Sequence, residues 1–158
     1  RMQPHFASQA YRLRALIANK NKDTAAAEAE FKRAALVDRA PAAYIDLGQF
    51  YQQQNQPDKA VEALQAGIDA DRRKDATLVD AASILTAMNR SPELAERLLR
   101  EYLSSSARSD DAPAFKVHVQ LGDILARRGD AAAARREYAA AASLASNYAP
   151  ARKAMQGS

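Results

Sequence analysis

The 158-residue chain has no cysteine and no tryptophan, and it is poor in glycine and phenylalanine. The lack of cysteine excludes disulfides and thiolate chemistry, and it argues against a structural zinc site. Strand-favouring β-branched and aromatic residues are scarce, which argues against a sheet. No stretch approaches the ~20 apolar residues that a membrane-spanning helix needs, so we expect no direct membrane insertion.

No sign of charge dominates either. The 23 basic and 19 acidic residues leave a net charge of +4, and the basic residues are spread along the chain. A nucleic-acid-binding surface needs a concentrated basic stripe, so we expect no nucleic-acid partner. The short basic clusters at 72–74 and 127–128 fall near predicted helix C-termini, where a cation gains about 0.3–1 kcal/mol from the helix dipole. We interpret these clusters as solvated helix ends.

What the chain has in abundance is alanine, roughly a quarter of all residues, which is the strongest helix former. Alanine also lets helices approach closely, because its side chain is a single methyl group. The composition therefore predicts an all-α fold.

Two segments 74 residues apart share one pattern. Each has Leu-Gly at its centre, a ring residue three before the leucine and a large residue three after the glycine. Each continues with an alanine twelve residues after the glycine, a large residue four further on, and a small residue three beyond that. The two sets are Tyr44, Leu47, Gly48, Tyr51, Ala60, Leu64 and Gly67, and His118, Leu121, Gly122, Leu125, Ala134, Tyr138 and Ala141. Their separation is two periods of about 34 residues with a short insertion.

This pattern resembles the tetratricopeptide repeat, whose two helices carry these residue types at these steps. A weaker copy comes first, with Tyr11, Ala15, Ala27, Phe31 and Ala34 at the equivalent steps. Another lies between the two good copies, with Ser83 at the glycine step and Tyr102 where a small residue is usual. The resemblance implies a right-handed α-solenoid of about four antiparallel helix hairpins.

The physics of the pattern points the same way. Two helices cross closely only where a side chain is nearly absent, as at Gly48 and Gly122. Tyr44, Leu47 and Tyr51 lie on one stripe of a helix, and a single hairpin cannot bury that stripe alone. Hairpins must therefore stack.

Residues that commonly begin or end helices divide the chain at places that agree with the repeat pattern. Two helices are predicted to begin at a proline, Pro57 and Pro92, the second with Ser91 as its N-cap. Gly129 is predicted to end one helix and Asp130 to cap the next, and Asp23-Thr24 marks the same kind of boundary in the first hairpin. We predict one domain over 1–158 with repeats at 8–40, 41–74, 75–111 and 112–148. A terminal helix at 149–156 either covers the last repeat or begins a fifth. Residues 104–111 form a polar connection that is long for this architecture.

In the family, a ligand peptide usually lies along the concave surface formed by the first helix of each hairpin. The resemblance therefore implies a protein- or peptide-binding surface one helical turn away from the buried stripe. The positions in this chain are Arg12, Leu16 and Lys20, Ile45, Gln49 and Gln53, Asp80 and Ile84, and Lys116, Val119, Asp123 and Arg127. Beside them lie Gln9, Asn19, Gln52 and Met88. The alternative is a solvated face whose apolar members pack between neighbouring helices.

Some family members clamp the C-terminal carboxylate of chaperones with a set of Lys, Asn and Arg side chains. The matching positions here are Arg12, Leu16, Asp46, Thr77 and Ala81. Only the first is basic, and Asp46 would repel a carboxylate. We therefore do not expect an adaptor of that kind.

Catalysis has little support in the sequence. The two histidines are far apart, and His118 occupies the large-residue step of its repeat, where a packed ring is the expected role. No phosphate-binding loop, metal-binding histidine pair or nucleophile motif occurs. We expect no enzyme activity, no metal and no cofactor.

The sequence thus predicts a non-catalytic scaffold that binds a protein or peptide. The alternative is a structural or self-associating segment of a longer solenoid, with a homo-oligomer as one form. The Ala- and Arg-rich composition is typical of bacteria with GC-rich genomes, and either the cytoplasm or an exported location fits it. Family analogy adds bacterial scaffolds of secretion, pilus or polysaccharide assembly.

The crossing at Gly48 can be tested by overpacking. Gly48→Leu should lower the free energy of unfolding by more than the ~1–3 kcal/mol of an ordinary core insertion, because the two helices must separate. Gln53→Leu on the same helix should be nearly silent. Urea denaturation measures the free energy of unfolding of both variants. Equal losses would contradict the assignment of Gly48 to the helix crossing of its hairpin.

Overall fold

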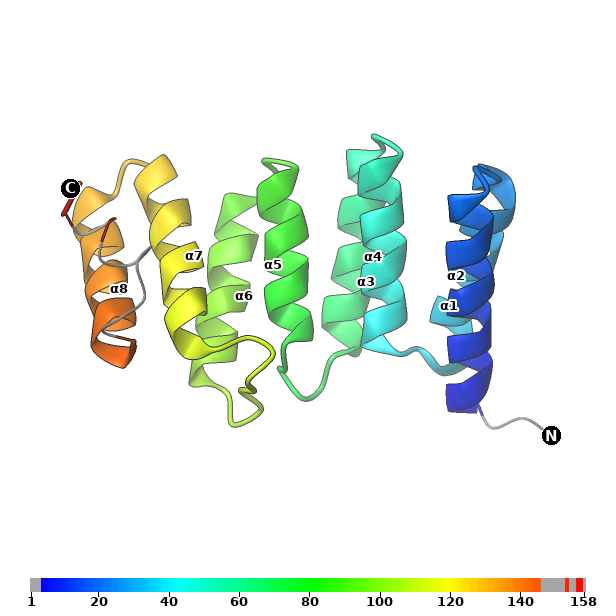
Figure 1. Ribbon diagram of the computed structural model, residues 1–158, viewed down its shortest axis with the longest axis horizontal. Helices are drawn as coiled ribbons and strands as arrows, with labels where there is room; N and C mark the ends of the chain where they lie inside the picture. The colour runs from blue at the N-terminus through cyan, green and yellow to red at the C-terminus, as the bar shows by residue number, and fades with distance from the viewer. Residues whose placement is uncertain (1–3, 146–152, 154–155, 158) are drawn as a thin grey trace. The chain divides into compact units, whose positions relative to one another are not determined.

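The computed structural model describes residues 4–145, 153, 156 and 157, and it shows eight α-helices over that part of the chain (Figure 1). These are α1 (Pro4–Lys20), α2 (Thr24–Asp38), α3 (Pro41–Gln53), α4 (Pro57–Ala70), α5 (Thr77–Ala87), α6 (Pro92–Ser104), α7 (Ala114–Arg127) and α8 (Ala131–Leu144). No strand occurs among the described residues. The predicted all-α fold is confirmed.

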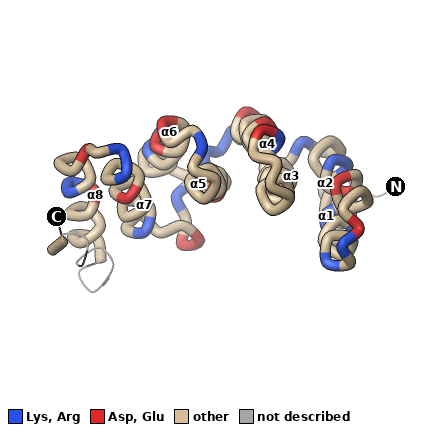
Figure 2. Tube along the Cα trace, turned by 90° about the horizontal axis from the view of Figure 1, so that it is seen from above, with Lys and Arg blue, Asp and Glu red and all other residues tan. Residues whose placement is uncertain are grey.

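The helices pair in chain order as hairpins, α1 with α2, α3 with α4, α5 with α6 and α7 with α8. The hairpins belong to two compact units, Arg1–Arg72 and Arg73–Ser158. Inside the first unit α3 packs on α2, and inside the second α7 packs on α6. Within each unit the first helices of the two hairpins lie on one side and the second helices on the other (Figure 2). The predicted repeat bounds within a single domain stay a prediction, and the predicted helix at 149–156 lies largely outside the described residues.

Close helix crossings occur where the two glycines were predicted to allow them. Gly48 and Gly122 are both buried. A Cβ atom at Gly48 would lie 2.7 Å from Leu64 Cδ2, and one at Gly122 would lie 2.4 Å from Tyr138 Cε1. Both distances are below van der Waals contact, so a side chain at either position would force Leu64 or Tyr138 to shift. The large residue of the second helix rests directly on the backbone of the first.

The hairpin turns use a common device. Each turn contains a residue with a left-handed backbone: Lys22, Asn55, Asn89 and Gly129, with φ of 62°, 55°, 53° and 87°. The third turn has a second such residue, Ser91. Asparagine and glycine tolerate this region best. After the turn, the Asp23 and Asp130 carboxylates accept from the amides of Ala26 and Ala133, at 3.1 and 3.0 Å, as predicted for N-caps.

Pro57 and Pro92 begin their helices as predicted, but the predicted cap at Ser91 is wrong in one respect. Ser91 does precede α6, yet its side chain forms no capping hydrogen bond. Its backbone is left-handed, with φ 46° and ψ 56°, whereas a capping serine needs an extended backbone to reach the amides of the first turn.

The third hairpin departs from the repeat pattern at Tyr102, and the structure gives the reason. The side chain is fully buried, at 0% exposure. Its hydroxyl donates to the carbonyl of Ala112 at 2.7 Å and accepts from the amide of Ser109 at 2.9 Å. Both partners belong to the long connection between α6 and α7. The tyrosine therefore fills the space below this loop and ties the loop to the hairpin.

Removing the Tyr102 hydroxyl should expose that role. Tyr102→Phe keeps the ring but leaves the Ala112 carbonyl, the acceptor of a buried hydrogen bond, without its donor, so the free energy of unfolding should fall by about 1–3 kcal/mol. Amide hydrogen exchange at 105–112 should also accelerate. Tyr11→Phe is the control, because that phenol forms no hydrogen bond with the described residues. An unchanged loop in Tyr102→Phe would contradict this account.

Candidate functional site

The first helices of unit 1 are joined by polar side chains one repeat apart. Arg12 Nε on α1 lies 2.5 Å from Asp46 Oδ2 on α3, and Asn19 Nδ2 donates to Gln53 Oε1 at 3.4 Å. Three of these four residues belong to the predicted binding face or its surroundings. The charge of Arg12 is thus already met by Asp46 within the unit.

The other predicted residues of unit 1 differ in exposure. Leu16, Lys20 and Gln49 are exposed, and Leu16 shows 55% of its surface. Ile45 is buried, and its Cδ1 lies 3.2 Å from the place that a Cβ on Gly67 would occupy. Ile45 therefore packs inside the second hairpin and offers little surface to a ligand.

In unit 2 the first helices enclose a small cleft. It has a volume of about 240 Å³ and lies between α5 and α7, with Ala82, Ser83, Thr86, Ala87, Leu99, Gln120, Asp123 and Arg127 as its lining. Gln120 Nε2 donates to Ser83 Oγ at 3.1 Å and links the two helices, as Arg12 and Asp46 do in unit 1. The hydroxyls of Ser83 and Thr86 donate back to carbonyls of α5, at 2.9 and 2.8 Å.

Two lining residues keep unused hydrogen-bonding capacity. Gln120 Oε1 is buried and has no hydrogen-bond partner among the described residues. Arg127 is exposed and forms no ion pair within the part of the chain that the structure describes. The lining of the cleft therefore includes a buried acceptor without a partner and an exposed cationic donor.

Asp123 is held at the cleft by the second helix of its own hairpin. The hydroxyl of Tyr138 on α8 donates to Asp123 Oδ1 at 2.8 Å. Burial of the phenol, followed by the hydrogen bond and charge of Asp123, raises the pKa of Tyr138 to about 12. This contact depends on the glycine step, because the Tyr138 ring reaches α7 over Gly122. A core tyrosine thus fixes a carboxylate on the predicted binding face.

The predicted residues of unit 2 are only partly brought together. Asp123 and Arg127 line the cleft. Ile84 is buried, at 9% exposure. Lys116 and Asp80 are exposed but are not among the residues that line the cleft. Val119 is half-buried. The prediction missed Ser83, Thr86 and Gln120. The position of Gln120, one helical turn before Asp123, could have indicated it.

One of the helix hairpins matches a known repeat family in sequence. The sequence profile of the family described as "Tetratricopeptide repeat" matches residues 41–74. Residues 41–74 form a tetratricopeptide repeat. A comparison with curated proteins found no significant match.

Solved structures share the tetratricopeptide fold with this chain. The pilF structure of Pseudomonas aeruginosa matches with a TM-score of 0.71 at 21% identity, over 96% of this chain and 67% of that one. A MamA structure matches with a TM-score of 0.70 at 15% identity, over 94% and 79%. YrrB, described as a TPR protein with an unusual peptide-binding site, matches with a TM-score of 0.65 at 19% identity, over 92% and 72%. The predicted fold class is confirmed, and the family profile covers one of the four predicted repeats.

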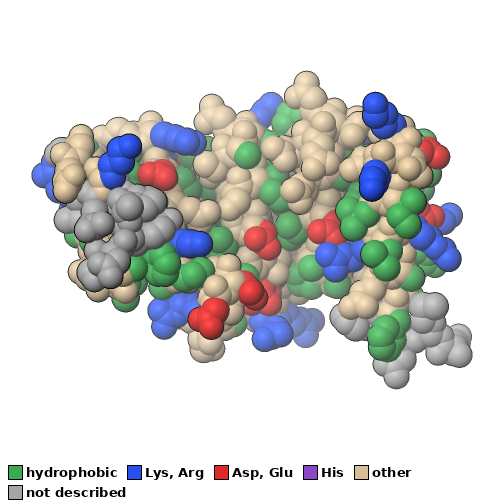
Figure 3. Space-filling model, in the orientation of Figure 1, with side chains coloured by type: hydrophobic (Ala, Val, Ile, Leu, Met, Phe, Trp, Pro, Cys, Tyr) green, Lys and Arg blue, Asp and Glu red, His purple; other side chains and the backbone are tan. Residues whose placement is uncertain are grey.

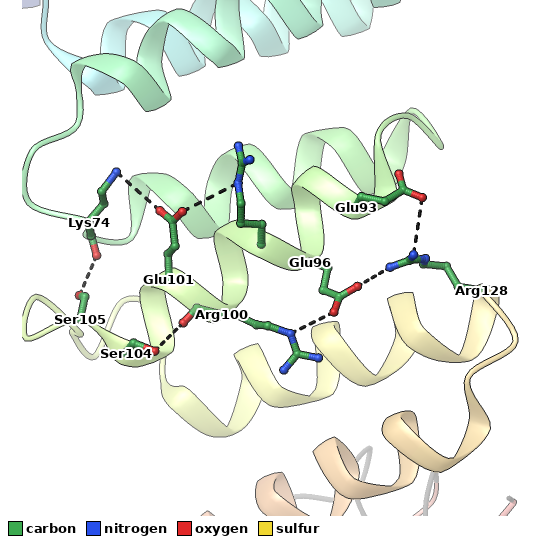
Figure 4. Close-up of a pocket in the computed structure, with 9 residues that line it drawn as sticks. Lys74, Glu93, Glu96, Arg100, Glu101, Ser104, Ser105 and Arg128 are labelled. Atoms are coloured by element: carbon green, nitrogen blue, oxygen red, sulfur yellow. Dashed lines mark hydrogen bonds and ion pairs between the residues drawn. The ribbon is translucent and has the colours of Figure 1, made fainter.

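A second, more open surface lies along α6, and ion pairs fill it. The groove has a volume of about 830 Å³, and Figure 4 shows its charged side chains pairing with one another. Glu96 pairs with Arg100 at 3.0 Å and also with Arg128, while Glu101 pairs with Lys74 at 3.6 Å and Arg97 at 3.8 Å. Because each charge has an opposite neighbour, we interpret this surface as a link between helices.

That network extends to the one histidine with a described side chain. His118 Nδ1 lies 2.7 Å from Glu137 Oε2, and Glu137 also lies 3.4 Å from Arg100. His118 therefore joins α7 to α8 in the packed position predicted for it. On the face seen in Figure 3, basic and acidic side chains are interspersed over each unit, and neither sign forms a continuous patch.

No group of three or more His, Asp or Glu side chains among the described residues is arranged to hold a metal ion. None of the described helices combines the length and the apolar character needed to cross a membrane.

The link between Tyr138 and Asp123 predicts a pH dependence. The pKa of Tyr138 in the folded chain is about 12, above the ordinary value of 10.0, so the folded state holds this proton more tightly. The resulting stability is fully present below pH 10 and is lost as the pH rises to 12. Urea denaturation over this range should show a steeper decline for the wild type than for Tyr138→Phe. Tyr44→Phe should keep the wild-type slope, and parallel curves for all three chains would refute the assignment.

Proposed function

We propose that the chain is a non-catalytic scaffold that binds a segment of another protein, with the cleft between α5 and α7 as its principal contact. Tetratricopeptide repeat proteins bind protein or peptide partners, and YrrB is described as having a peptide-binding site. The observation that carries the proposal is the buried Gln120 Oε1, an acceptor without a partner among the described residues, in a cleft that Arg127 borders.

The size of the cleft favours a peptide side chain over a small molecule. Small-molecule sites usually measure about 300–1,000 Å³. At about 240 Å³ the cleft lies below that range, and it opens along the surface between two helices. An extended segment can place one side chain in it and use its backbone groups outside it.

The chemistry of the lining defines the segment. A backbone amide or a side-chain donor would satisfy Gln120 Oε1, and a carbonyl or carboxylate of the ligand would accept from Arg127. Asp123 would receive a second donor, because Tyr138 occupies only one of its oxygens. The cleft thus suits a polar segment with donors and acceptors in alternation.

Exposed residues of unit 1 would supply a separate contact surface. Leu16, Lys20, Gln49 and Gln53 lie on exposed parts of its first helices and combine an apolar anchor with polar groups. Arg12 contributes less to binding, since its guanidinium is bonded to Asp46.

The non-catalytic part of the proposal rests on the chemistry that the sequence provides. The chain has no cysteine and two histidines, at positions 5 and 118. His118 is bonded to Glu137 in an ion-pair network, and among the described residues its ring has no hydrogen bond to a serine or threonine hydroxyl. Catalysis by a nucleophile and a base needs these groups within hydrogen-bonding reach of each other.

Peptide display with the full chain tests the proposal. Peptides enriched from a random library should bind Arg127→Glu at least tenfold more weakly, a loss of about 1.4 kcal/mol, as fluorescence anisotropy would measure. Arg136→Glu makes the same change in charge on an exposed position of α8 outside the cleft, and it should leave affinity within twofold. Equal losses in both variants would mean that net charge alone governs binding, and no loss in either would remove the cleft from the binding surface.

A further inference from the structure

The fourth hairpin places a carboxylate where α6, α7 and α8 meet. Glu137 on α8 lies 2.7 Å from His118 Nδ1 on α7 and 3.4 Å from Arg100 on α6. Arg100 also pairs with Glu96, one turn earlier on α6, at 3.0 Å (Figure 4). One glutamate thus connects its own hairpin with the second helix of the hairpin before it.

The second helix of the first hairpin carries the same cation and the same pairing. Counting from the large residue of each second helix, Lys32 of α2 corresponds to Arg100 of α6, and Glu28 corresponds to Glu96. Lys32 pairs with Glu28 at 2.8 Å, and its side chain is 53% exposed, against 48% for Arg100. The cation in unit 1 is therefore held in the same way as the cation that binds Glu137.

The carboxylate itself has no counterpart in unit 1. Tyr44 of α3 occupies the step of His118, and Ala63 of α4 occupies the step of Glu137. Tyr44 is half-buried, and its hydroxyl forms no hydrogen bond within the part of the chain that the structure describes. Where unit 2 has a glutamate side chain, unit 1 has a single methyl group.

A pocket of about 320 Å³ lies at this place. Its lining includes all three residues that correspond to Glu137 and its partners, which are Ala63, Tyr44 and Lys32. Lys59 adds a second cation, and Glu62 is the one acidic residue of the lining and is exposed. The space left by the alanine therefore faces two cations and an unused hydroxyl donor.

The pocket adjoins a second hollow of about 590 Å³, since Tyr44 and Ala66 line both. Arg39 and Arg72 line this second hollow, both are exposed, and neither forms an ion pair with another described residue. Asp69 is the one acidic residue of its lining. Each hollow thus has two cations and one carboxylate in its lining, which favours an anionic ligand.

We propose that the two hollows, which we call the α2–α4 groove, bind an acidic segment of a partner protein. A glutamate side chain of this segment lies beside Lys32 and Tyr44 as Glu137 lies beside its own partners. The groove runs along α4 from Lys59 to Ala70, which is about 16 Å at the rise of a helix. An extended segment of about five residues spans that length. This site is separate from the cleft between α5 and α7 and does not rest on the function proposed for it.

The existing ion pair of Lys32 leaves room for this ligand. An ammonium group has three N–H donors, and Glu28 does not use them all. Arg100 binds Glu137 although it is already paired within α6, so a cation in this position accepts a second carboxylate. The Tyr44 hydroxyl supplies a further donor, in the place where the His118 ring contacts the glutamate.

Supplying the missing carboxylate from the chain itself tests the proposal. The probe is the peptide acetyl-Ala-Glu-Ala-Ala-Glu-Ala amide, titrated into the full chain and followed by amide NMR. It should shift the signals of α2 and α4 around Lys32 and Ala63, and it should bind Ala63→Glu at least tenfold more weakly. Gln49→Glu is the matched control, because it adds the same charge at an exposed position of α3 outside the groove, and it should keep the affinity within twofold.

A second pair of variants gives an answer even where Ala63→Glu fails to fold. Lys32→Gln removes the cation of the pocket and should weaken the peptide several-fold. Lys22→Gln removes the same charge from an exposed turn residue and should have no such effect. A peptide with glutamine in place of both glutamates should leave the signals of α2 and α4 unshifted in the unchanged chain.

The other outcomes overturn the proposal. Ala63→Glu with undiminished affinity would remove the groove as the site, and losses that match those of Gln49→Glu would reduce the effect to overall charge. Glutarate that binds as tightly as the peptide would assign the groove to free dicarboxylic acids. A loss seen in Arg127→Glu alone would place the peptide in the cleft between α5 and α7, so the two proposed sites can fail independently.

Discussion

In the second and fourth hairpins the fold depends on one contact, in which a large side chain of the second helix rests on the bare backbone of the first helix at a glycine. At Gly48 and Gly122 the missing side chain gives Leu64 and Tyr138 their places, and a Cβ atom there would force these two side chains to shift. Close packing of the two helices within a hairpin fixes the surface that the neighbouring hairpin of the same unit contacts. The stacking of α3 on α2 and of α7 on α6 follows from it.

The same contact connects the core with the candidate binding surface. Tyr138 can reach across α7 only because Gly122 leaves room, and its hydroxyl then holds Asp123 at the cleft. In the other good repeat the corresponding second-helix residue is Leu64, which has no polar group to offer. Two hairpins with the same packing therefore differ in what they present on their first-helix face.

Much of the architecture could be predicted from the sequence, because small residues at a fixed period have one simple explanation. The crossings, the proline starts of helices and the aspartate caps all followed from local chemistry. Ser91 did not, because its capping depends on a backbone conformation that residue type alone does not determine. The fit of Tyr102 could not be predicted either, since its partners lie in a loop without a pattern of its own.

The candidate site was less accessible to sequence reasoning. Helical periodicity placed Ile45 and Ile84 near the surface of their helices, but each lies at the border of the buried stripe, where neighbouring packing decides exposure. The pairing of Gln120 with Ser83 could not be predicted, because the long loop between α6 and α7 shifts the fourth repeat out of the regular period. Such contacts between repeats depend on how the hairpins stack, which the residues of one helix do not reveal.

If the cleft binds a peptide segment as proposed, the bond between Tyr138 and Asp123 affects which ligands it accepts. A ligand that pulled the Asp123 carboxylate toward itself would leave a buried phenol with no acceptor, and that loss would oppose binding. Ligands that leave the carboxylate in place and approach its outward oxygen avoid this penalty. In the binding role proposed for the cleft, the interior of the fourth hairpin would thereby favour some partners over others without contacting them.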